Sequence, residues 1–349
     1  MRAAIFEAFG GEIEIVEVRD PEPTVDGVVL EVQANGICRS DWHAWMGHDA
    51  SVFLPHVPGH EMAGRIVATG AKVVGFEVGD RVTLPFVLGC GECRECVSGN
   101  QQICDNQHQP GFSGWGAFAE YVVLPFASNN LVHLPETMTF EAAAGLGCRF
   151  ATAYRAVIDQ GAVAEGTAVA VWGCGGVGLS AVMIASALGA DVVAIDIDSK
   201  ALELARNFGA AHVVLSSADS DDVRAVTELL DGGAEVSFDA LGSTQTAVSS
   251  IECLRKRGRH VQIGLMIGEA SHPVIPMWAL HGKEIEMAGV HGMQAWQYHD
   301  MFKMIEQGLV SPQALVTETV DLRGGVEHLQ TMDAYPGNGF VVINRFGGT

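Results

Sequence analysis

The strongest constraint on the fold of this chain is a repeated alternation of strands and helices between residues 150 and 290. Short apolar runs occupy 167–172, 192–196, 212–215, 236–240 and 261–264. Stretches of helical periodicity follow the first four of them, at 177–188, 200–208, 222–230 and 246–254. Repeated strand-helix units predict an α/β fold with a doubly wound parallel sheet.

A glycine-rich turn joins the first strand of this region to its helix. Its G-x-G-x-x-G motif spans 173–178 and includes Gly173, Gly175, Gly176, Val177 and Gly178 around Cys174. Between a strand and a helix, this motif predicts a dinucleotide site with the pyrophosphate at the helix N-terminus. Asp196 ends the next strand, where a carboxylate binds ribose hydroxyls and repels a 2′-phosphate, so NAD is favoured over NADP. The alternative is a tight turn that binds nothing.

The flanking regions differ from this α/β segment. Runs at 13–18, 27–32, 65–68, 81–85 and 119–123, separated by Gly and Pro, predict a β-rich domain at 1–149. A length of 349 residues favours two domains, with one oversized barrel-like domain as the alternative. We expect the coenzyme domain at 150–290. The segment 291–349, with a helix near 300–307 and a strand at 339–343, is expected to pack back onto the first domain.

Four cysteines are clustered within the glycine-rich segment 89–105. Cys90, Cys93, Cys96 and Cys104 have the spacing C-x2-C-x2-C-x7-C, which suits a tetrahedral zinc ion. An iron–sulfur cluster and two disulfides are the alternatives. Four thiolates leave no open coordination position, so the predicted zinc stabilises a loop and takes no part in a reaction.

A second set of metal-binding residue types is dispersed along the chain. Cys38, His60 and Cys148 are individually weak signals, because single cysteines and histidines are usually structural. Together they provide the three protein ligands of a catalytic zinc, whose fourth position is left for water or substrate. Cys174 and Cys253 belong to neither set and are interpreted as structural.

Charge and hydropathy exclude several classes of function. Lys and Arg total 20 against 42 Asp and Glu, and the resulting net charge of −22 repels a nucleic acid. The uncharged stretch 166–190 is long enough for a membrane span, but its central glycines favour a buried strand followed by a helix. Glu7, Glu12 and Glu14 interrupt any apolar run of signal-peptide length, so we expect a cytoplasmic protein.

The motifs and their order resemble those of zinc-dependent alcohol dehydrogenases in the medium-chain dehydrogenase/reductase superfamily. The matching elements are Cys38-x-Ser40-x2-His43, Gly59-His60-Glu61-x2-Gly64-x5-Gly70-x2-Val73, Gly79-Asp80-Arg81-Val82, the four-cysteine segment and the glycine-rich turn. The resemblance covers essentially the whole chain. It implies a GroES-like catalytic domain, a Rossmann coenzyme domain, two zinc ions per chain, and reversible oxidation of alcohols with hydride transfer to NAD⁺.

The resemblance also implies roles for individual residues. Cys38, His60 and Cys148 resemble the catalytic zinc ligands, and Glu61 resembles a carboxylate that lies behind the metal and exchanges into its shell. Ser40 resembles the hydroxyl that accepts the substrate proton, and His43 resembles the end of the relay that passes it to solvent.

The roles implied for the cofactor and substrate sites are less complete. Arg39 resembles a pyrophosphate ligand, and Thr152 resembles the threonine beside the nicotinamide ring. Phe86 falls where the family places an aromatic pocket wall, and Trp42 and Trp115 are further candidates for the pocket. An aromatic lining favours apolar or aromatic primary and secondary alcohols over polyols.

One departure from the family pattern concerns the end of the chain. Relatives often carry an arginine soon after the glycine of the closing strand, whereas Phe340 follows Gly339 here, and Arg345 lies further on. Two alternative functions remain at this point: a polyol or other medium-chain dehydrogenase, and a non-catalytic sensor of NAD and zinc. The length is typical of homotetramers in the family, with a homodimer as the alternative.

Overall fold

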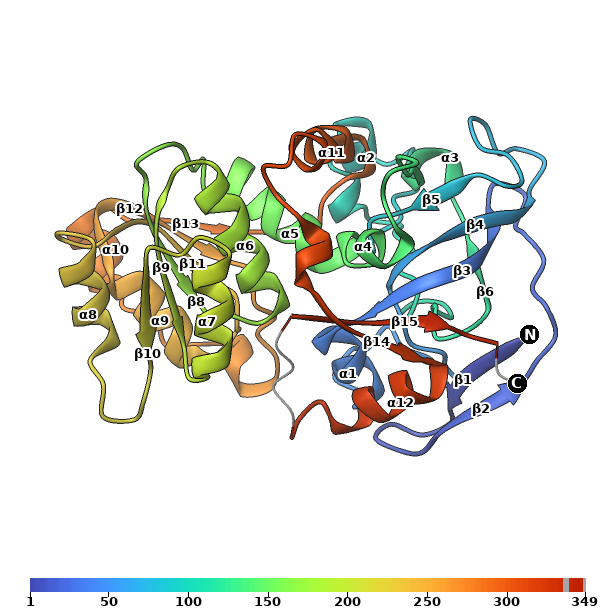
Figure 1. Ribbon diagram of the computed structural model, residues 1–349, viewed down its shortest axis with the longest axis horizontal. Coiled ribbons are helices and arrows are strands. Elements are labelled where there is room, and N and C mark those ends of the chain that lie inside the picture. Colours follow the sequence, from blue (N-terminus) through green and yellow to red (C-terminus); the bar gives the residue numbers. More distant parts are fainter. Residues whose placement is uncertain (335–338, 348–349) are drawn as a thin grey trace. The chain divides into compact units, whose positions relative to one another are not determined.

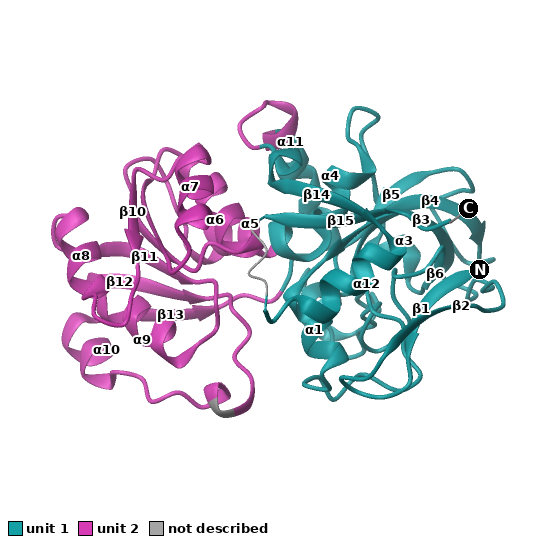
Figure 2. Ribbon diagram, turned by 60° about the horizontal axis from the view of Figure 1, so that its bottom comes forward, with its two compact units in different colours: residues 1–151, 292–303, 311–349 teal, residues 152–291, 304–310 magenta. Residues whose placement is uncertain are grey.

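The computed structural model describes residues 1–334 and 339–347, and these form two compact units. Unit 1 comprises Met1–Ala151, Gly292–Lys303 and the described residues of Ser311–Thr349. Unit 2 comprises Thr152–His291 and Met304–Val310 (Figure 2).

Unit 2 is built on a six-stranded, fully parallel sheet in the order β10-β9-β8-β11-β12-β13 (Figure 1). The strands are β8 (Ala168–Trp172), β9 (Asp191–Asp196), β10 (His212–Leu215), β11 (Ala234–Asp239), β12 (Leu254–Gln262) and β13 (Glu286–Gly289). The order changes direction on either side of β8, so the carboxyl end of β8 is the switch point at which such sheets bind ligands. The predicted α/β class with a doubly wound parallel sheet is confirmed.

The helices of unit 2 alternate with its strands along the chain, and the first of them precedes β8. They are η3 (Ala156–Gln160), α6 (Gly176–Ala187), α7 (Ser199–Asn207), α8 (Asp222–Leu229), α9 (Thr244–Glu252), η4 (Gly268–Ser271) and α10 (Met277–Lys283). In β8, Val169, Ala170 and Val171 have no exposed surface, as expected for a strand covered on both faces. Among the described residues, no helix has the length and apolar character needed to cross a membrane. The uncharged stretch is instead divided between β8 and α6.

Unit 1 contains an antiparallel hairpin and a larger mixed sheet. A hairpin pairs β1 (Arg2–Phe6) with β2 (Ile13–Glu17), and a larger sheet has the order β14-β15-β3-β4-β5-β7, with β6 also paired to β3. The strands of the larger sheet are β3 (Val28–Ile37), β4 (Glu61–Thr69), β5 (Arg81–Thr83), β6 (Tyr121–Leu124), β7 (Val132–His133), β14 (Val316–Asp321) and β15 (Phe340–Arg345). Leu30, Phe118 and Ile343 are fully buried members of its core.

Short helices connect these strands. They are α1 (Arg39–Trp45), α2 (Arg94–Val97), η1 (Gln101–Ile103), α3 (Ala127–Asn130), α4 (Phe140–Ala144), η2 (Leu146–Phe150), η5 (Ala295–Gln297), η6 (Pro312–Leu315) and α12 (Leu322–Thr331). Two further helices, α5 (Ala151–Arg155) and α11 (Tyr298–Glu306), include residues of both units.

The end of the chain holds more structure than the sequence pattern indicated. The expected helix and closing strand correspond to α11 and β15, but β14 and α12 were not expected. Glycines lower helix propensity, and Gly324 and Gly325 therefore disguised α12. Gly325 has no side chain because a Cβ at this position would lie 2.4 Å from Cδ1 of Ile343, so helix α12 can pack closely on β15.

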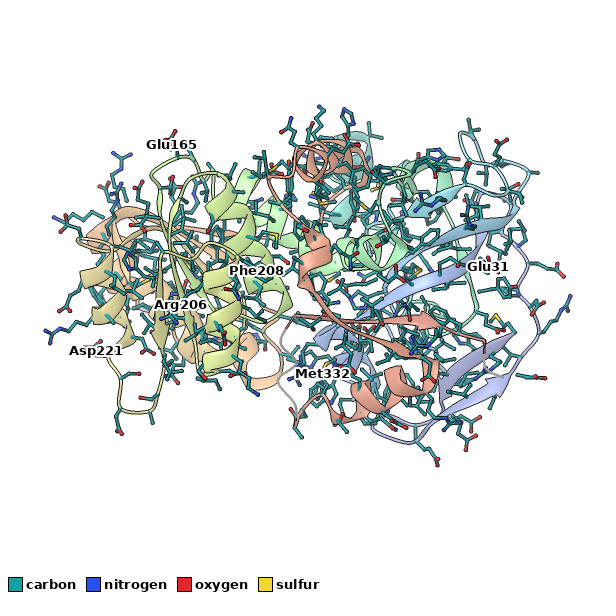
Figure 3. All side chains as sticks on the ribbon, viewed as in Figure 1. Glu31, Glu165, Arg206, Phe208, Asp221 and Met332 are labelled. Carbon is teal, nitrogen blue, oxygen red and sulfur yellow. The ribbon has the colours of Figure 1, made fainter. Side chains whose placement is uncertain are left out.

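Among acidic residues that the structure leaves exposed, Glu165 and Asp221 extend from the surface of unit 2 (Figure 3).

Candidate functional site

Three short structural elements bring a set of metal-binding side chains together in unit 1. Cys38 caps α1, His60 directly precedes β4, and Cys148 lies in the π-helical turn η2. Their ligand atoms all lie within 4.8 Å of one another. Cys38 and His60 are buried, and Cys148 is partly buried. The structure thus assembles the dispersed set that the sequence suggested.

Asp41 orients His60, although the sequence reasoning gave this residue no role. Its fully buried carboxylate lies 2.7 Å from Nδ1 of His60 and accepts hydrogen bonds from the backbone N–H groups of Cys38 and Gly59 at 3.0 and 3.1 Å. The bond to Cys38 also closes the first turn of α1 as a capping box. We assign the Nδ1 proton to the bond with Asp41, which leaves the lone pair on Nε2.

The donor chemistry of this set fits zinc. Nε2 of His60 is buried and has no hydrogen-bond partner among the described residues, which is the arrangement expected of a metal ligand held by a carboxylate. The hydrogen bond with Cys148 holds the pKa of Cys38 well below its usual range, whereas the same bond and burial raise the pKa of Cys148. Burial by itself would lower the pKa of His60, but Asp41 and Cys38 raise it well above its usual value. A dication that binds here therefore displaces protons from the set.

Glu61 lies beside this set but is bonded elsewhere. The backbone N–H and Nε of Arg149 donate to its two carboxylate oxygens at 2.7 and 2.8 Å, and Nη2 of Arg149 also donates to Oε2. Burial raises the pKa of Glu61, against the opposing effect of Arg149. The group of converging ligand atoms consists of Cys38, His60 and Cys148, without Glu61.

Helix α1 carries the two residues expected to move a proton. Ser40 is partly buried in its first turn, and His43 lies one turn further on. Nδ1 of His43 lies 3.1 Å from Nδ1 of the exposed His48, and the Trp42 ring packs against both imidazoles. Burial, together with the charges of His48 and Arg39, lowers the pKa of His43 from 6.5 to about 4. His43 is therefore neutral and only weakly basic at neutral pH.

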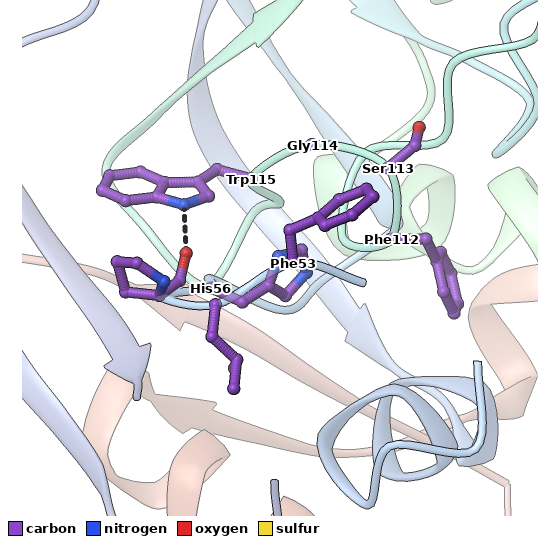
Figure 4. Close-up of a pocket in the computed structure, with 8 residues that line it drawn as sticks. Phe53, His56, Phe112, Ser113, Gly114 and Trp115 are labelled. Atoms are coloured by element: carbon purple, nitrogen blue, oxygen red, sulfur yellow. Dashed lines mark hydrogen bonds between the residues drawn. The ribbon is translucent and has the colours of Figure 1, made fainter. Parts of the chain in front are cut away.

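The aromatic candidates occupy different surroundings. The Phe86 ring centroid lies 6.0 Å from that of His60, and the ring of Phe112, which the sequence reasoning missed, lies 5.1 Å from it. Phe112 and Trp115 line a pocket of about 200 Å³, and Nε1 of Trp115 donates to the carbonyl of Pro55 (Figure 4). Trp42 packs on the two histidines and does not line this pocket.

The four clustered cysteines converge as well. The Sγ atoms of Cys90, Cys93, Cys96 and Cys104 all lie within 4.8 Å of one another. Sγ of Cys104 lies 3.5 Å from that of Cys90 and 3.7 Å from that of Cys93, and the Sγ atoms of Cys90 and Cys96 are 4.0 Å apart. Four sulfurs around one zinc ion at 2.3 Å would be about 3.8 Å apart, so the spacing fits a single tetrahedral ion. None of the eight cysteines, all of which lie in the described residues, forms a disulfide.

Backbone N–H groups support these sulfurs. Those of Cys96 and Asp105 lower the pKa of Cys93 to about 6, and that of Glu92 lowers the pKa of Cys90. The base of the loop is held by buried Asn130, whose side chain exchanges two 2.8 Å hydrogen bonds with the backbone of Gly89. This geometry fits a closed structural zinc site.

The glycine-rich turn in unit 2 has the close packing that a dinucleotide site needs. Gly173 has a φ of +91°, and a Cβ on Gly178 would lie 1.8 Å from the carbonyl oxygen of Gly173. Helix α6 begins at Gly176 without a side-chain cap, so no capping side chain occupies its first N–H groups, which suits an anion. Asp196 reaches this turn, because its Oδ2 accepts the N–H of Cys174 at 2.6 Å.

The other two expected cofactor residues are placed as follows. Arg39 is exposed on α1, where it donates to the carbonyl of Met332 at 3.0 Å and pairs with Asp333 at 3.4 Å. Thr152 is buried in α5 and belongs to unit 2. Arg345 is exposed at the end of β15 and donates to Oδ1 of Asn344.

Dehydrogenases that hold a nicotinamide cofactor on a Rossmann sheet and a reactive metal on a GroES-like domain form one class, and both parts are recognisable here. Residues 25–136 match the family model described as "Alcohol dehydrogenase GroES-like domain", and residues 176–307 match "Zinc-binding dehydrogenase". The chain belongs to the zinc-dependent alcohol dehydrogenase family. It is an oxidoreductase of small alcohols and aldehydes with zinc and NAD as cofactors, so the expected family, activity and cofactors are confirmed.

Individual relatives support this assignment over most of the chain. An alcohol dehydrogenase of Geobacillus stearothermophilus is 35% identical over 78% of this chain and 80% of its own length. An NAD-dependent alcohol dehydrogenase of Saccharolobus solfataricus is 30% identical over 98% and 99% of the two chains. The solved structure of an alcohol dehydrogenase from Thermus sp. ATN1 superposes with a TM-score of 0.90 at 28% identity, covering 99% of this chain and 100% of the other.

Proposed function

We propose that the protein reversibly oxidises apolar or aromatic primary and secondary alcohols to aldehydes or ketones, with hydride transfer to NAD⁺. The observation that carries this proposal is the convergence of Cys38, His60 and Cys148, with Nε2 of His60 lacking a hydrogen-bond partner in the described part of the chain. Residues 1–149 and 291–349 would form the catalytic domain, and 150–290 the coenzyme domain. In this reading, Cys90, Cys93, Cys96 and Cys104 hold the structural zinc.

The reaction needs a Lewis acid and a hydride acceptor, which zinc and NAD⁺ supply when bound. Cys38, His60 and Cys148 would hold the zinc, and Asp41 keeps His60 in the required orientation. Ser40 accepts the hydroxyl proton of the alcohol at Oγ. His43 would pass this proton on to solvent without holding it, because its lowered pKa keeps the imidazole neutral.

For the cofactor, the glycine-rich turn and the N-terminus of α6 would bind the pyrophosphate, with Arg39 as a second ligand. Asp196 would bind the ribose hydroxyls, since a carboxylate retains acceptor capacity beyond its bond to the N–H of Cys174. Thr152 is assigned to the nicotinamide ring. Each of these roles rests on the matching motif position together with the local geometry.

The substrate class follows from the side chains around His60. The rings of Phe86 and Phe112 lie against its imidazole, and Trp115 lines the adjacent pocket. Apolar walls favour hydrocarbon groups and leave the hydroxyls of a polyol without partners. A polyol dehydrogenase is therefore the alternative that the assay must separate.

The decisive experiment records NADH formation over a panel of aliphatic alcohols, aromatic alcohols and polyols, together with metal analysis. We expect two zinc ions per chain and the highest kcat/KM for apolar alcohols. Ser40→Ala and His43→Ala should lower kcat while the metal content stays unchanged. Activity confined to polyols would refute the substrate class, and a folded, zinc-loaded protein inert towards the whole panel would refute the catalytic role.

We also propose a homotetramer, with a homodimer as the alternative, located in the cytoplasm. Strand β13 ends the sheet of unit 2, and Val274, Met277 and Trp278, in the segment before it, are 88%, 62% and 65% exposed. An open strand edge and exposed apolar side chains are both suited to pairing with a second copy. Eight unpaired cysteines suit a reducing compartment. Light scattering of the wild type and of Trp278→Asp tests the assembly, and a monomeric wild type would refute it.

A further inference from the structure

Arg149 directly follows Cys148 in the chain, and its guanidinium is paired with the Glu61 carboxylate. Three of its N–H groups donate to Glu61, from the backbone N, Nε and Nη2. Arg149 is 5% exposed and Glu61 is fully buried. Buried ion pairs of this kind persist only when their geometry is closely supported.

Neighbouring residues provide that support. The Phe340 ring lies under the guanidinium, with its centroid 3.9 Å from Cζ of Arg149. Gly36 faces Glu61 across the β3–β4 pairing, and a Cβ there would lie 2.5 Å from Oε2 of Glu61. A Cβ on Gly145 would lie 2.4 Å from the Phe340 ring. The two glycines and the phenylalanine therefore leave room for this ion pair and hold it in place.

This arrangement gives a structural meaning to the unusual end of the chain. Phe340 stands where the family pattern leads one to expect an arginine, and its ring stacks on a guanidinium that comes from the segment of Cys148. The positive charge behind the metal set is therefore supplied by the same turn that supplies a ligand.

The charges explain what this pairing prevents. With both cysteines ionised, Cys38, Cys148 and Glu61 carry three negative charges, of which a zinc ion balances two and Arg149 the third. Without Arg149, the Glu61 carboxylate would be buried and unpaired beside a dication. The dication would then be the strongest attraction for this carboxylate.

We infer that Arg149 is a positioning residue for the catalytic metal, which holds the Glu61 carboxylate out of the coordination sphere and so keeps the fourth position open for substrate. The inference rests on the proposed catalytic set of Cys38, His60 and Cys148. It concerns how that set is kept at three protein ligands, and it assigns Arg149 a role apart from proton transfer.

The test compares Arg149→Met with the double variant Arg149→Met/Glu61→Gln, using cobalt-substituted protein and chelator competition. In Arg149→Met, Glu61 enters the coordination sphere. We therefore expect a changed visible spectrum of the cobalt protein, slower loss of zinc to the chelator, and a kcat about 10- to 100-fold lower. Glu61→Gln in the same background removes the competing carboxylate and should restore the wild-type spectrum and rate of zinc loss.

Arg81→Met is the matched control, because Arg81 also lies over a phenylalanine ring, at 4.8 Å from Phe140, and donates to backbone carbonyls. It should lower the melting temperature without altering the cobalt spectrum. An unchanged spectrum in Arg149→Met, or faster loss of zinc, would overturn the inference and leave a purely structural role. If Arg149→Met does not fold, the comparison is made between Arg149→Lys and the double variant. Arg149→Lys keeps the positive charge, whereas the double variant removes both charges of the ion pair.

Failure of the proposed function is distinguishable from failure of this inference. An inactive wild type, or one whose cobalt spectrum lacks thiolate bands from the Cys38 and Cys148 set, would remove the premise. An active wild type with an unaltered Arg149→Met spectrum would overturn the role of Arg149 alone.

Discussion

Replacing Asp41 by Asn separates the orientation of His60 from the mere filling of space. The carboxylate accepts three hydrogen bonds, from Nδ1 of His60, the N–H of Cys38 and the N–H of Gly59. An amide has one oxygen, so at least one of these donors loses its acceptor in either orientation of the Asn side chain.

The magnitude follows from this geometry. All three bonds are buried and lie at 2.7 to 3.1 Å, and a buried donor left unsatisfied costs about 1–3 kcal/mol of stability. Loss of a carboxylate partner from a ligating histidine weakens metal binding by about 10- to 100-fold. Asp41→Asn should therefore lose zinc from the catalytic set to a chelator at a correspondingly lower chelator concentration, while the four-cysteine zinc is retained.

Asp239→Asn provides a matched control in unit 2. Asp239 is also fully buried and accepts three N–H groups, from Leu241, Gly242 and the side chain of Gln262. Both variants should be destabilised in thermal unfolding, but only Asp41→Asn should show weaker zinc binding. Equal zinc affinity in the two variants would refute the assignment of Asp41 to His60.

Three further predictions follow from other parts of the structure. Asn130→Ala removes both hydrogen bonds to Gly89 and should release the four-cysteine zinc sooner on heating, with kcat unchanged; release of the catalytic zinc first would contradict it. Asp196→Ser removes the carboxylate that would face a 2′-phosphate and should shift the ratio of kcat/KM values towards NADP⁺, although loss of the bond to the N–H of Cys174 should also weaken NAD⁺ binding. The pKa of His43 is lowered from 6.5 to about 4, so the unfolded chain binds a proton at this residue first, and the free energy of unfolding falls as the pH drops through this range. In urea denaturation at several pH values, His43→Gln should show a smaller fall, and parallel curves for the two proteins would refute the shift.

The overall architecture was largely predictable because it follows from local patterns. Buried parallel strands such as β8 and β9 contain continuous apolar runs, and amphipathic helices such as α7 show their periodicity without reference to neighbours. β14 escaped prediction because most of its residues are exposed, and α12 because Gly325 serves packing against Ile343 instead of helix propensity.

In the candidate site, too, some residues were predictable from local sequence and others were not. Residue type and spacing pointed to the four clustered cysteines, whereas residue type and the family resemblance pointed to Cys38, His60 and Cys148, because metal ligands are a small chemical class. The partners that orient and balance them were not predictable. Arg149 meets Glu61 from 88 positions away, and Phe112 packs on His60 from a distant loop.

The sequence by itself therefore determined the fold class and the cofactors and pointed to the candidate metal-binding residues, since these depend on local periodicity and on chemically specific side chains. Only the tertiary structure decided that Asp41 orients His60 and that Arg149 pairs with Glu61. It also decided that the Phe340 ring stacks on the Arg149 guanidinium, at a position where relatives often carry an arginine. The physical reason is that hydrogen bonds and ion pairs between buried groups depend on distance in space. Neighbours in space are set by how β3, β4 and the turn η2 pack, which no local pattern records.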